Sequence, residues 1–117
     1  MKIVAVIVTY YPVHRMLHEL VTSIVGQVDE IVVVDNGSDE KSIRQIEEYA
    51  AGLVTLIRLN GNAGVAVAQN RGIIFAREVQ ADYVVLVDQD SKPEPEMVSR
   101  LLLVAEEKKS IGIPVAA

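Results

Sequence analysis

Four short apolar runs, separated by segments with a different hydrophobic period, constrain the fold of this chain more than any other feature. The runs cover residues 3–8, 31–34, 54–59 and 83–87 and are rich in Val and Ile. Short continuous runs of β-branched residues are typical of strands that are covered on both faces. A further run at 111–115, interrupted by Pro114, predicts the start of a fifth strand.

Between the runs, apolar residues recur at the spacing of amphipathic helices. Pro12 stands where the first helix would begin, and residues 65–80 form a stretch too long for a strand. Strands that alternate with helices predict an α/β fold, with three α/β/α layers around a mainly parallel sheet and right-handed crossovers. The other expected helix faces are Val13, Leu17, Leu20, Val21 and Ile24; Ile43, Ile46 and Ala50; and Met97, Leu101, Val104 and Ala105.

Length and composition favour one soluble domain over residues 1–117. Half of the residues are hydrophobic and cysteine is absent, which excludes disulfides and thiolate metal sites. The net charge of −5 disfavours a nucleic-acid partner. The run at 3–8 is too short to span a membrane, and His14 and Arg15 follow where a secretory signal would have small residues. We therefore expect a cytoplasmic chain and leave open a peripheral association with the inner face of the membrane.

Polar residues gather where the predicted strands end. In open parallel sheets, ligands bind beyond the carboxyl ends of the strands, so the sequence places a binding site at this edge. The four strand ends read Thr9-Tyr10-Tyr11, Asp35-Asn36-Gly37-Ser38-Asp39, Asn60-Gly61-Asn62-Ala63-Gly64 and Asp88-Gln89-Asp90-Ser91.

Asp88 and Asp90, one residue apart after a buried strand, are the sharpest of these features. As the backbone turns, both carboxylates can point at one spot, where their repulsion is costly unless a cation offsets it. Such hard oxygen ligands favour Mg²⁺ or Mn²⁺, which keep positions open for phosphate oxygens. An isolated Asp-x-Asp more often lies on a solvated turn, but its place among other polar strand ends favours a metal site.

Asp35 supports a functional and a structural interpretation equally. As the last residue of an apolar run it should be partly shielded, where its carboxylate can accept a hydrogen bond from a ligand N–H, such as the imide of uracil or thymine. The Asn36-Gly37 pair is, however, a turn signal, and Ser38 or Asp39 can cap the next helix. We expect Ser38 to be the cap.

Residues 60–72 combine small side chains with amides. Gly64 allows the backbone to approach a ligand closely, and a helix that begins near this residue favours phosphate. Asn70 or Arg71 can face the cleft, although a solvated surface cation is the favoured interpretation of Arg71. His14 and His18 have a metal-binding spacing but no third ligand pattern, so two solvent-facing histidines are favoured.

Taken together, these motifs resemble the N-terminal half of the inverting glycosyltransferases of family 2, which have the GT-A fold of nucleotide-diphospho-sugar transferases. The resemblance rests on I-V-T-Y-Y-P at residues 7–12, V-V-V-D-N-G-S at 32–38, N-A-G-V-A-V-A-Q-N-R-G at 62–72 and V-L-V-D-Q-D-S at 85–91. The last motif and the V-D-N-G-S loop are most similar to the rhamnosyltransferase branch, whose members use dTDP-rhamnose to build surface polysaccharides.

The resemblance implies roles for individual residues. The Thr9-Tyr10-Tyr11 segment would line the nucleobase pocket, although the family commonly has Asn where Tyr11 stands. Asp35 would bind the N3–H of the base, and Asn62, Gly64 and Asn70 would complete the nucleotide-sugar site. Asp88 would lie near the ribose, and with Asp90 it would hold Mn²⁺ or Mg²⁺ on the diphosphate of dTDP-rhamnose or a UDP-sugar. A hydroxyl of a saccharide or lipid-linked acceptor would then attack and invert the anomeric carbon.

The short chain raises an alternative to a complete enzyme. In the family the general base belongs to a second half, so we expect it beyond Ala117 and expect residues 1–117 alone to be inactive and to self-associate. The alternative is a non-catalytic nucleotide-sugar binding module, or a fragment that acts with a partner chain. A dinucleotide-dependent oxidoreductase is disfavoured, because no G-x-G-x-x-G follows the first apolar run.

Overall fold

The predicted alternation of strands and helices is present in the computed structural model, which describes residues 1–50 and 52–108. The predicted strand at 111–115 lies outside the described residues. In chain order the elements are β1 (Ile3–Thr9), α1 (His14–Ile24), β2 (Glu30–Asp35), α2 (Glu40–Ala50), β3 (Thr55–Arg58), α3 (Val65–Glu78), β4 (Tyr83–Asp88) and α4 (Met97–Lys108).

All four described strands run parallel, in the order β3-β2-β1-β4. In the ladders, Thr9 of β1 pairs with Asp35 of β2, and Val8 pairs with Asp88 of β4. The register therefore brings the carboxyl ends of these three strands to the same edge of the sheet. The predicted polar strand ends meet there because every crossover returns the chain to the opposite edge.

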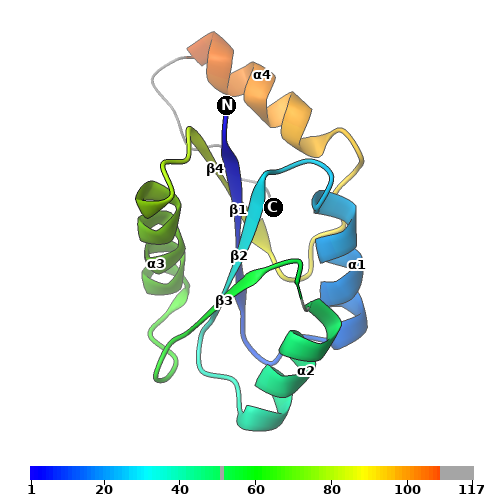
Figure 1. Ribbon diagram of the computed structural model, residues 1–117, viewed down its shortest axis with the longest axis vertical. Coiled ribbons are helices and arrows are strands. Elements are labelled where there is room, and N and C mark those ends of the chain that lie inside the picture. The colour runs from blue at the N-terminus through cyan, green and yellow to red at the C-terminus, as the bar shows by residue number, and fades with distance from the viewer. Residues whose placement is uncertain (51, 109–117) are drawn as a thin grey trace.

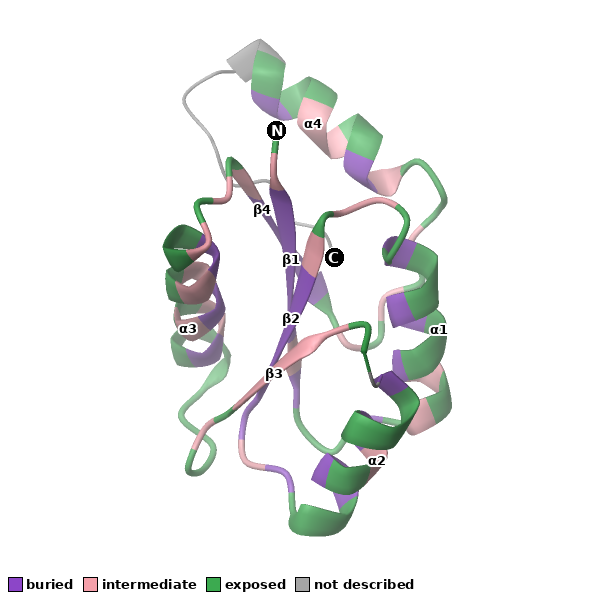
Figure 2. Cartoon of the chain, viewed as in Figure 1, coloured by how far each residue is buried: buried purple, intermediate pink, exposed green. Residues whose placement is uncertain are grey.

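Helices cover both faces of the sheet, as the unbroken apolar runs predict (Figure 1). Alternate β1 residues separate the two cores: Ile3, Ala5 and Ile7 pack with α1, α2 and α4, while Val4 and Val6 pack with α3. The central strands β1 and β2 are buried along most of their length, whereas β3 at the edge is only half-buried (Figure 2). The three-layer α/β/α prediction is confirmed.

Helix α3 lies close to the sheet because its inner face is built from small residues. Ala68, Gly72 and Ala76, spaced four apart, are its buried positions. A Cβ atom at Gly72 would lie 2.3 Å from Val6 Cγ1, so any other residue there would force Val6 or the helix to shift. The helix ends at Glu78, two residues before the predicted boundary at Gln80. Gln80 itself adopts a left-handed φ of 61°.

The start of α2 corrects one prediction. The side chain that caps this helix belongs to Asp39, whose Oδ1 accepts a hydrogen bond from the Ser42 N–H over 2.8 Å. Ser38, the predicted cap, instead donates its hydroxyl hydrogen to Asp35 over 2.7 Å. The helix thus begins one residue later than expected, which frees Ser38 to stabilise the strand end.

No helix in the described part of the chain is long and apolar enough to cross a membrane.

Candidate functional site

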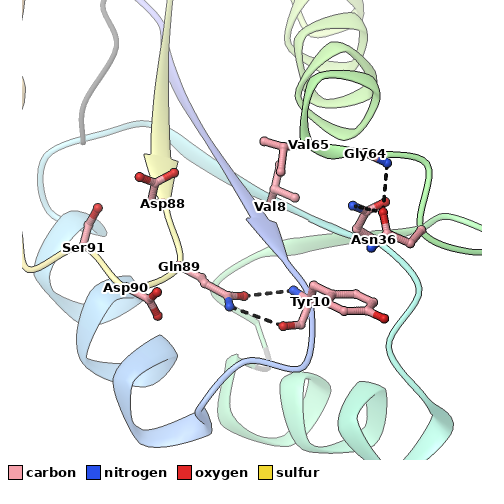
Figure 3. A pocket seen from close by; sticks show the side chains of 10 residues that line it. Val8, Tyr10, Asn36, Gly64, Val65, Asp88, Gln89, Asp90 and Ser91 are labelled. Atoms are coloured by element: carbon pink, nitrogen blue, oxygen red, sulfur yellow. Dashed lines mark hydrogen bonds between the residues drawn. The ribbon is translucent and has the colours of Figure 1, made fainter.

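The carboxyl edge of the sheet is hollowed by a pocket of about 540 Å³ (Figure 3). Its wall takes residues from the ends of β1, β2 and β4 and from the loop that leads into α3. The pocket is therefore made by the segments that the sequence singled out as polar strand ends. The lining residues are Val8, Tyr10, Asn36, Asn62, Gly64, Val65, Asp88, Gln89, Asp90 and Ser91.

On the β4 side, a tight turn carries the two acidic residues. The Ser91 N–H donates to the Asp88 carbonyl over 3.0 Å, which closes the turn and places Asp88 and Asp90 on the pocket wall with exposed side chains. Their hard oxygens fit the donor set that Mg²⁺ and Mn²⁺ prefer. Residues 1–50 and 52–108 contain no group of three or more acidic, His or Cys side chains able to hold a metal.

On the β1 side, the backbone of Tyr10 is tied to the β4 turn. Gln89 Oε1 accepts from the Tyr10 N–H over 2.9 Å, and Gln89 Nε2 donates to the Tyr10 carbonyl over 3.3 Å. The Tyr10 ring is about half exposed and packs edge-on against Tyr11, with ring centroids 4.9 Å apart. Tyr11 has a left-handed φ of 46°, and its N–H donates to Ser38 Oγ over 2.8 Å.

Behind the pocket, Asp35 is the centre of a buried hydrogen-bond network. Its Oδ1 accepts from the hydroxyls of Thr9 and Ser38, and its Oδ2 accepts from the N–H groups of Gly37 and Ser38. A carboxylate has about four acceptor positions, so the chain itself occupies all of them. With 1% of its surface exposed, Asp35 does not line the pocket. Its contact with a base N3–H stays a prediction, and such a contact would have to displace one of these donors.

Two asparagines join the β2 end to the loop before α3. Asn36, 2% exposed, donates from Nδ2 to Asn62 Oδ1 over 3.2 Å and accepts from the Ala63 N–H over 2.9 Å. Asn62 Oδ1 also accepts from the Gly64 N–H over 3.0 Å. The amides therefore hold the loop in place at the pocket wall.

The first turn of α3 reaches the pocket without a side-chain cap. Gly64 precedes this helix with a φ of 93° and has no side chain to cap it, and among the described residues no side chain accepts from the N–H groups of Val65 or Ala66. Uncapped N–H groups and the helix dipole make such an end attractive to anions. Gly64 and Val65 both line the pocket, so this partial positive charge lies opposite the carboxylates of the β4 turn (Figure 3).

The structure brings together five of the predicted site residues. Tyr10, Asn62, Gly64, Asp88 and Asp90 line one pocket. Thr9, Tyr11 and Asp35 lie behind it or at its side, and Asn70 is exposed on α3 away from the lining residues.

The residue predictions overlooked two amides of the pocket wall, Asn36 and Gln89. Each stands beside a predicted aspartate, and that adjacency to Asp35 and Asp88 is the signal that could have found them.

The basic residues weighed from the sequence lie outside this pocket. Arg71 is half-buried, and not fully solvated as predicted; its Nη1 is buried without a hydrogen-bond partner in the described part of the chain. His18 is exposed as predicted, whereas His14, which was also expected to face solvent, is half-buried and stacks on Tyr49 with ring centroids 6.0 Å apart.

Sequence comparisons agree with this geometry. Residues 5–116 match the family model described as glycosyl transferase family 2. The chain is 38% identical over 103 residues to the dTDP-rhamnosyl transferase RfbF of Shigella flexneri, covering 86% of this chain and 33% of that protein. It is 28% identical over 115 residues to the undecaprenyl-phosphate 4-deoxy-4-formamido-L-arabinose transferase of Edwardsiella ictaluri, covering 91% of this chain and 34% of that protein.

A solved structure supports the fold independently. The crystal structure of S. aureus TarS 1-349 matches with a TM-score of 0.68 at 23% identity, covering 92% of this chain and 33% of that one. The chain thus spans about a third of the length of these proteins. Since the family match extends over nearly every residue and the fold agrees with it, this chain belongs to glycosyl transferase family 2.

Proposed function

We propose that the pocket binds the nucleoside-diphosphate sugar donor of an inverting, metal-assisted glycosyl transfer. One observation carries this proposal: the carboxylates of Asp88 and Asp90 lie opposite the uncapped start of α3 in the same pocket. A diphosphate placed between them meets N–H groups on one side and a cation site on the other.

The remaining wall suits a nucleoside. The half-exposed Tyr10 ring offers an apolar face to a base, and the amides of Asn36 and Asn62 offer hydrogen-bond groups to its edge. Asp88, at the end of β4, lines the same pocket, and in this proposal it accepts a hydrogen bond from a ribose hydroxyl. Val8 and Val65 add apolar surface to the pocket wall.

The transfer itself needs the donor held rigidly while the leaving group accumulates charge. Asp90, with Asp88, would hold Mg²⁺ or Mn²⁺, which supplies Lewis-acid stabilisation of the departing nucleoside diphosphate. The N–H groups at the start of α3 donate to the same phosphates. The acceptor hydroxyl attacks the anomeric carbon from the opposite face and inverts it. The proton of this hydroxyl passes to a general base that we expect outside residues 1–117. We also expect most of the groups that bind the saccharide or lipid-linked acceptor to lie outside these residues.

The donor that we favour is dTDP-rhamnose, with a UDP-sugar as the alternative. The choice of dTDP-rhamnose is supported by the Shigella relative, a dTDP-rhamnosyl transferase that is 38% identical to this chain over 103 residues. Because the chain spans about a third of that relative, we propose that residues 1–117 bind the donor and do not by themselves transfer its sugar.

Calorimetric titration of dTDP-rhamnose, dTDP and UDP, each with and without Mn²⁺, tests the donor site. We expect metal-dependent binding that Asp90→Asn abolishes. Asp82→Asn is the matched control. Asp82 directly precedes the first residue of β4, at the end of the strand opposite the pocket, and an amide oxygen there can still accept from the Lys2 N–H. Binding that ignores Mn²⁺, or that survives Asp90→Asn, would contradict the proposal.

A further inference from the structure

Gln89 stands between the two pocket carboxylates, and its side chain reaches across to the end of β1 (Figure 3). The parallel ladder between β1 and β4 ends at the pair Val8 and Asp88. One step further on, the Gln89 amide accepts from the Tyr10 N–H over 2.9 Å and donates to the Tyr10 carbonyl over 3.3 Å. A side chain therefore supplies the acceptor and the donor that a longer β4 would have supplied from its backbone.

We propose that Gln89 is a positioning residue for donor binding, which clamps Tyr10 to the turn that carries Asp88 and Asp90. This inference rests on the proposed function of the pocket. The clamp makes one rigid unit of the aromatic ring from β1 and the carboxylates from β4. Because the ring and the carboxylates meet different parts of the donor, the clamp fixes the distance between the base subsite and the cation subsite.

The conformation of the β1 end explains why a clamp is useful there. The chain bends at Tyr10 directly after the strand, and Tyr11 takes a left-handed φ that is uncommon for a residue with a side chain. The Tyr11 N–H is fixed by Ser38 from the β2 side, and the Tyr10 backbone by Gln89 from the β4 side. Both neighbouring strand ends therefore hold the bend, so the backbone that carries the half-exposed Tyr10 ring is fixed before a ligand arrives.

Glutamine is the side chain whose chemistry suits this contact. Its planar amide presents one acceptor and two donor hydrogens at a spacing close to that of a peptide group. Asparagine is one methylene shorter, ionised glutamate has no donor, and methionine has similar length but no comparable hydrogen-bonding group. Loss of the clamp leaves the ring free to sample other positions, and binding then has to order it again.

The matched variants are Gln89→Met and Gln27→Met in the 117-residue chain. Gln27 also has an amide that joins two elements, accepting from the Val98 N–H over 3.0 Å and donating to the Glu94 carbonyl over 3.2 Å, but it lies outside the pocket. Two measurements are needed: exchange of the Tyr10 amide hydrogen by NMR in the free chain, and affinity for dTDP with Mn²⁺. We expect Gln89→Met to accelerate the exchange and to weaken binding, each by about tenfold, whereas Gln27→Met changes neither.

Gln89→Glu adds a readout that a merely structural role would not produce. At neutral pH its carboxylate keeps an acceptor for the Tyr10 N–H but has no donor for the Tyr10 carbonyl. Protection of the Tyr10 amide hydrogen should therefore be retained in Gln89→Glu and lost in Gln89→Met, at the same pH. Protection in Gln89→Glu as low as that in Gln89→Met would overturn the clamp.

The outcomes separate this inference from the proposed function. Unchanged Tyr10 exchange in Gln89→Met overturns the clamp, and faster exchange with unchanged dTDP affinity overturns its role in positioning. A wild-type chain that binds no nucleoside diphosphate overturns the donor-site proposal and with it the positioning role. The exchange measurement would still show whether Gln89 orders Tyr10.

Discussion

The Thr9 hydroxyl donates a hydrogen bond of 2.8 Å to Asp35 Oδ1, which joins the last residues of the neighbouring strands β1 and β2. Both side chains are almost wholly buried, and Asp35 also accepts from Gly37 and Ser38. One carboxylate thus fixes the β2 loop, and through Ser38 it fixes the Tyr11 backbone. The pocket rests on a buried acidic residue that does not itself face the pocket.

Asp35→Asn should therefore destabilise the chain although the change removes only one charge. The amide has a single acceptor oxygen, and hydrogen bonds to a charged acceptor are the stronger ones, so we expect a loss of about 1–3 kcal/mol in the free energy of unfolding. Asp39→Asn, four residues along the chain, is the matched control because Asn and Asp cap helices equally well. Urea unfolding of both variants measures the difference, and equal stabilities would contradict the network.

Gly72→Ala tests the close contact between α3 and the sheet. The new Cβ would lie 2.3 Å from Cγ1 of the buried Val6, a stiff β-branched side chain. Overpacking costs about 1–3 kcal/mol and the higher helix propensity of alanine offsets about 1, so we expect a net loss of up to about 2 kcal/mol. Gly26→Ala, where nothing lies within 4 Å of the new Cβ, should leave the unfolding midpoint unchanged or slightly raised.

Tyr83 should ionise at a higher pH than an ordinary tyrosine does. Its hydroxyl donates to Glu106 Oε1 over 2.7 Å, and this hydrogen bond raises the pKa of Tyr83 above its ordinary value, with smaller contributions from desolvation and from the charges of Glu106 and Asp82. A raised folded-state pKa means that the unfolded chain loses this proton first. The stability contributed by the bond is thus present below pH ~10 and is lost as the pH rises through the folded-state pKa.

Spectrophotometric titration of the phenolates measures whether the pKa of Tyr83 is raised. The wild type should show a late ionisation step, and Tyr83→Phe should remove that step. Tyr49→Phe is the control, because its ring contacts His14 and His18 and lies away from Glu106. A late step that persists in Tyr83→Phe would assign it to another residue.

The sequence predicted the architecture well because the signals for it are periodic. Unbroken apolar runs required a sheet covered on both faces, and the alternation with helices required parallel strands. Together these features predict Tyr10, Asn62, Gly64, Asp88 and Asp90 at one edge of the sheet, where the structure has them. The predicted helix cap failed by a single residue, Asp39 in place of Ser38, because both are good caps and local spacing does not separate them.

The hydrophobic pattern of the sequence does not predict side-chain contacts between strands. The bond between Gln89 and Tyr10 depends on the register of β1 and β4 and on the direction of one side chain, and neither follows from apolar periodicity. The same holds for Asp35, whose position suggested a ligand contact while its four hydrogen bonds come from residues that the fold brings around it. Burial alone therefore does not separate a binding carboxylate from a structural one.

The two-carboxylate site leads to a prediction about the order of binding. Asp88 and Asp90 offer too few protein ligands to hold Mn²⁺ tightly, and the described residues contain no third acidic, His or Cys side chain beside them. A bound diphosphate would add oxygens to the same cation, so dTDP should raise the affinity for Mn²⁺ by about tenfold or more. Because such coupling is reciprocal, Mn²⁺ should raise the affinity for dTDP by the same factor.

Paired titrations measure both sides of this cycle: Mn²⁺ into the chain with and without saturating dTDP, and dTDP with and without Mn²⁺. Each titration is corrected for the Mn²⁺–dTDP complex that forms in solution. Thymidine, which has the base and no phosphates, is the control and should leave the Mn²⁺ affinity unchanged. Asp90→Asn should bring both coupling factors close to one, because the shared cation is then lost. Tight Mn²⁺ binding in the absence of any nucleotide would show that the protein supplies a complete metal site elsewhere and would contradict the assignment to Asp88 and Asp90.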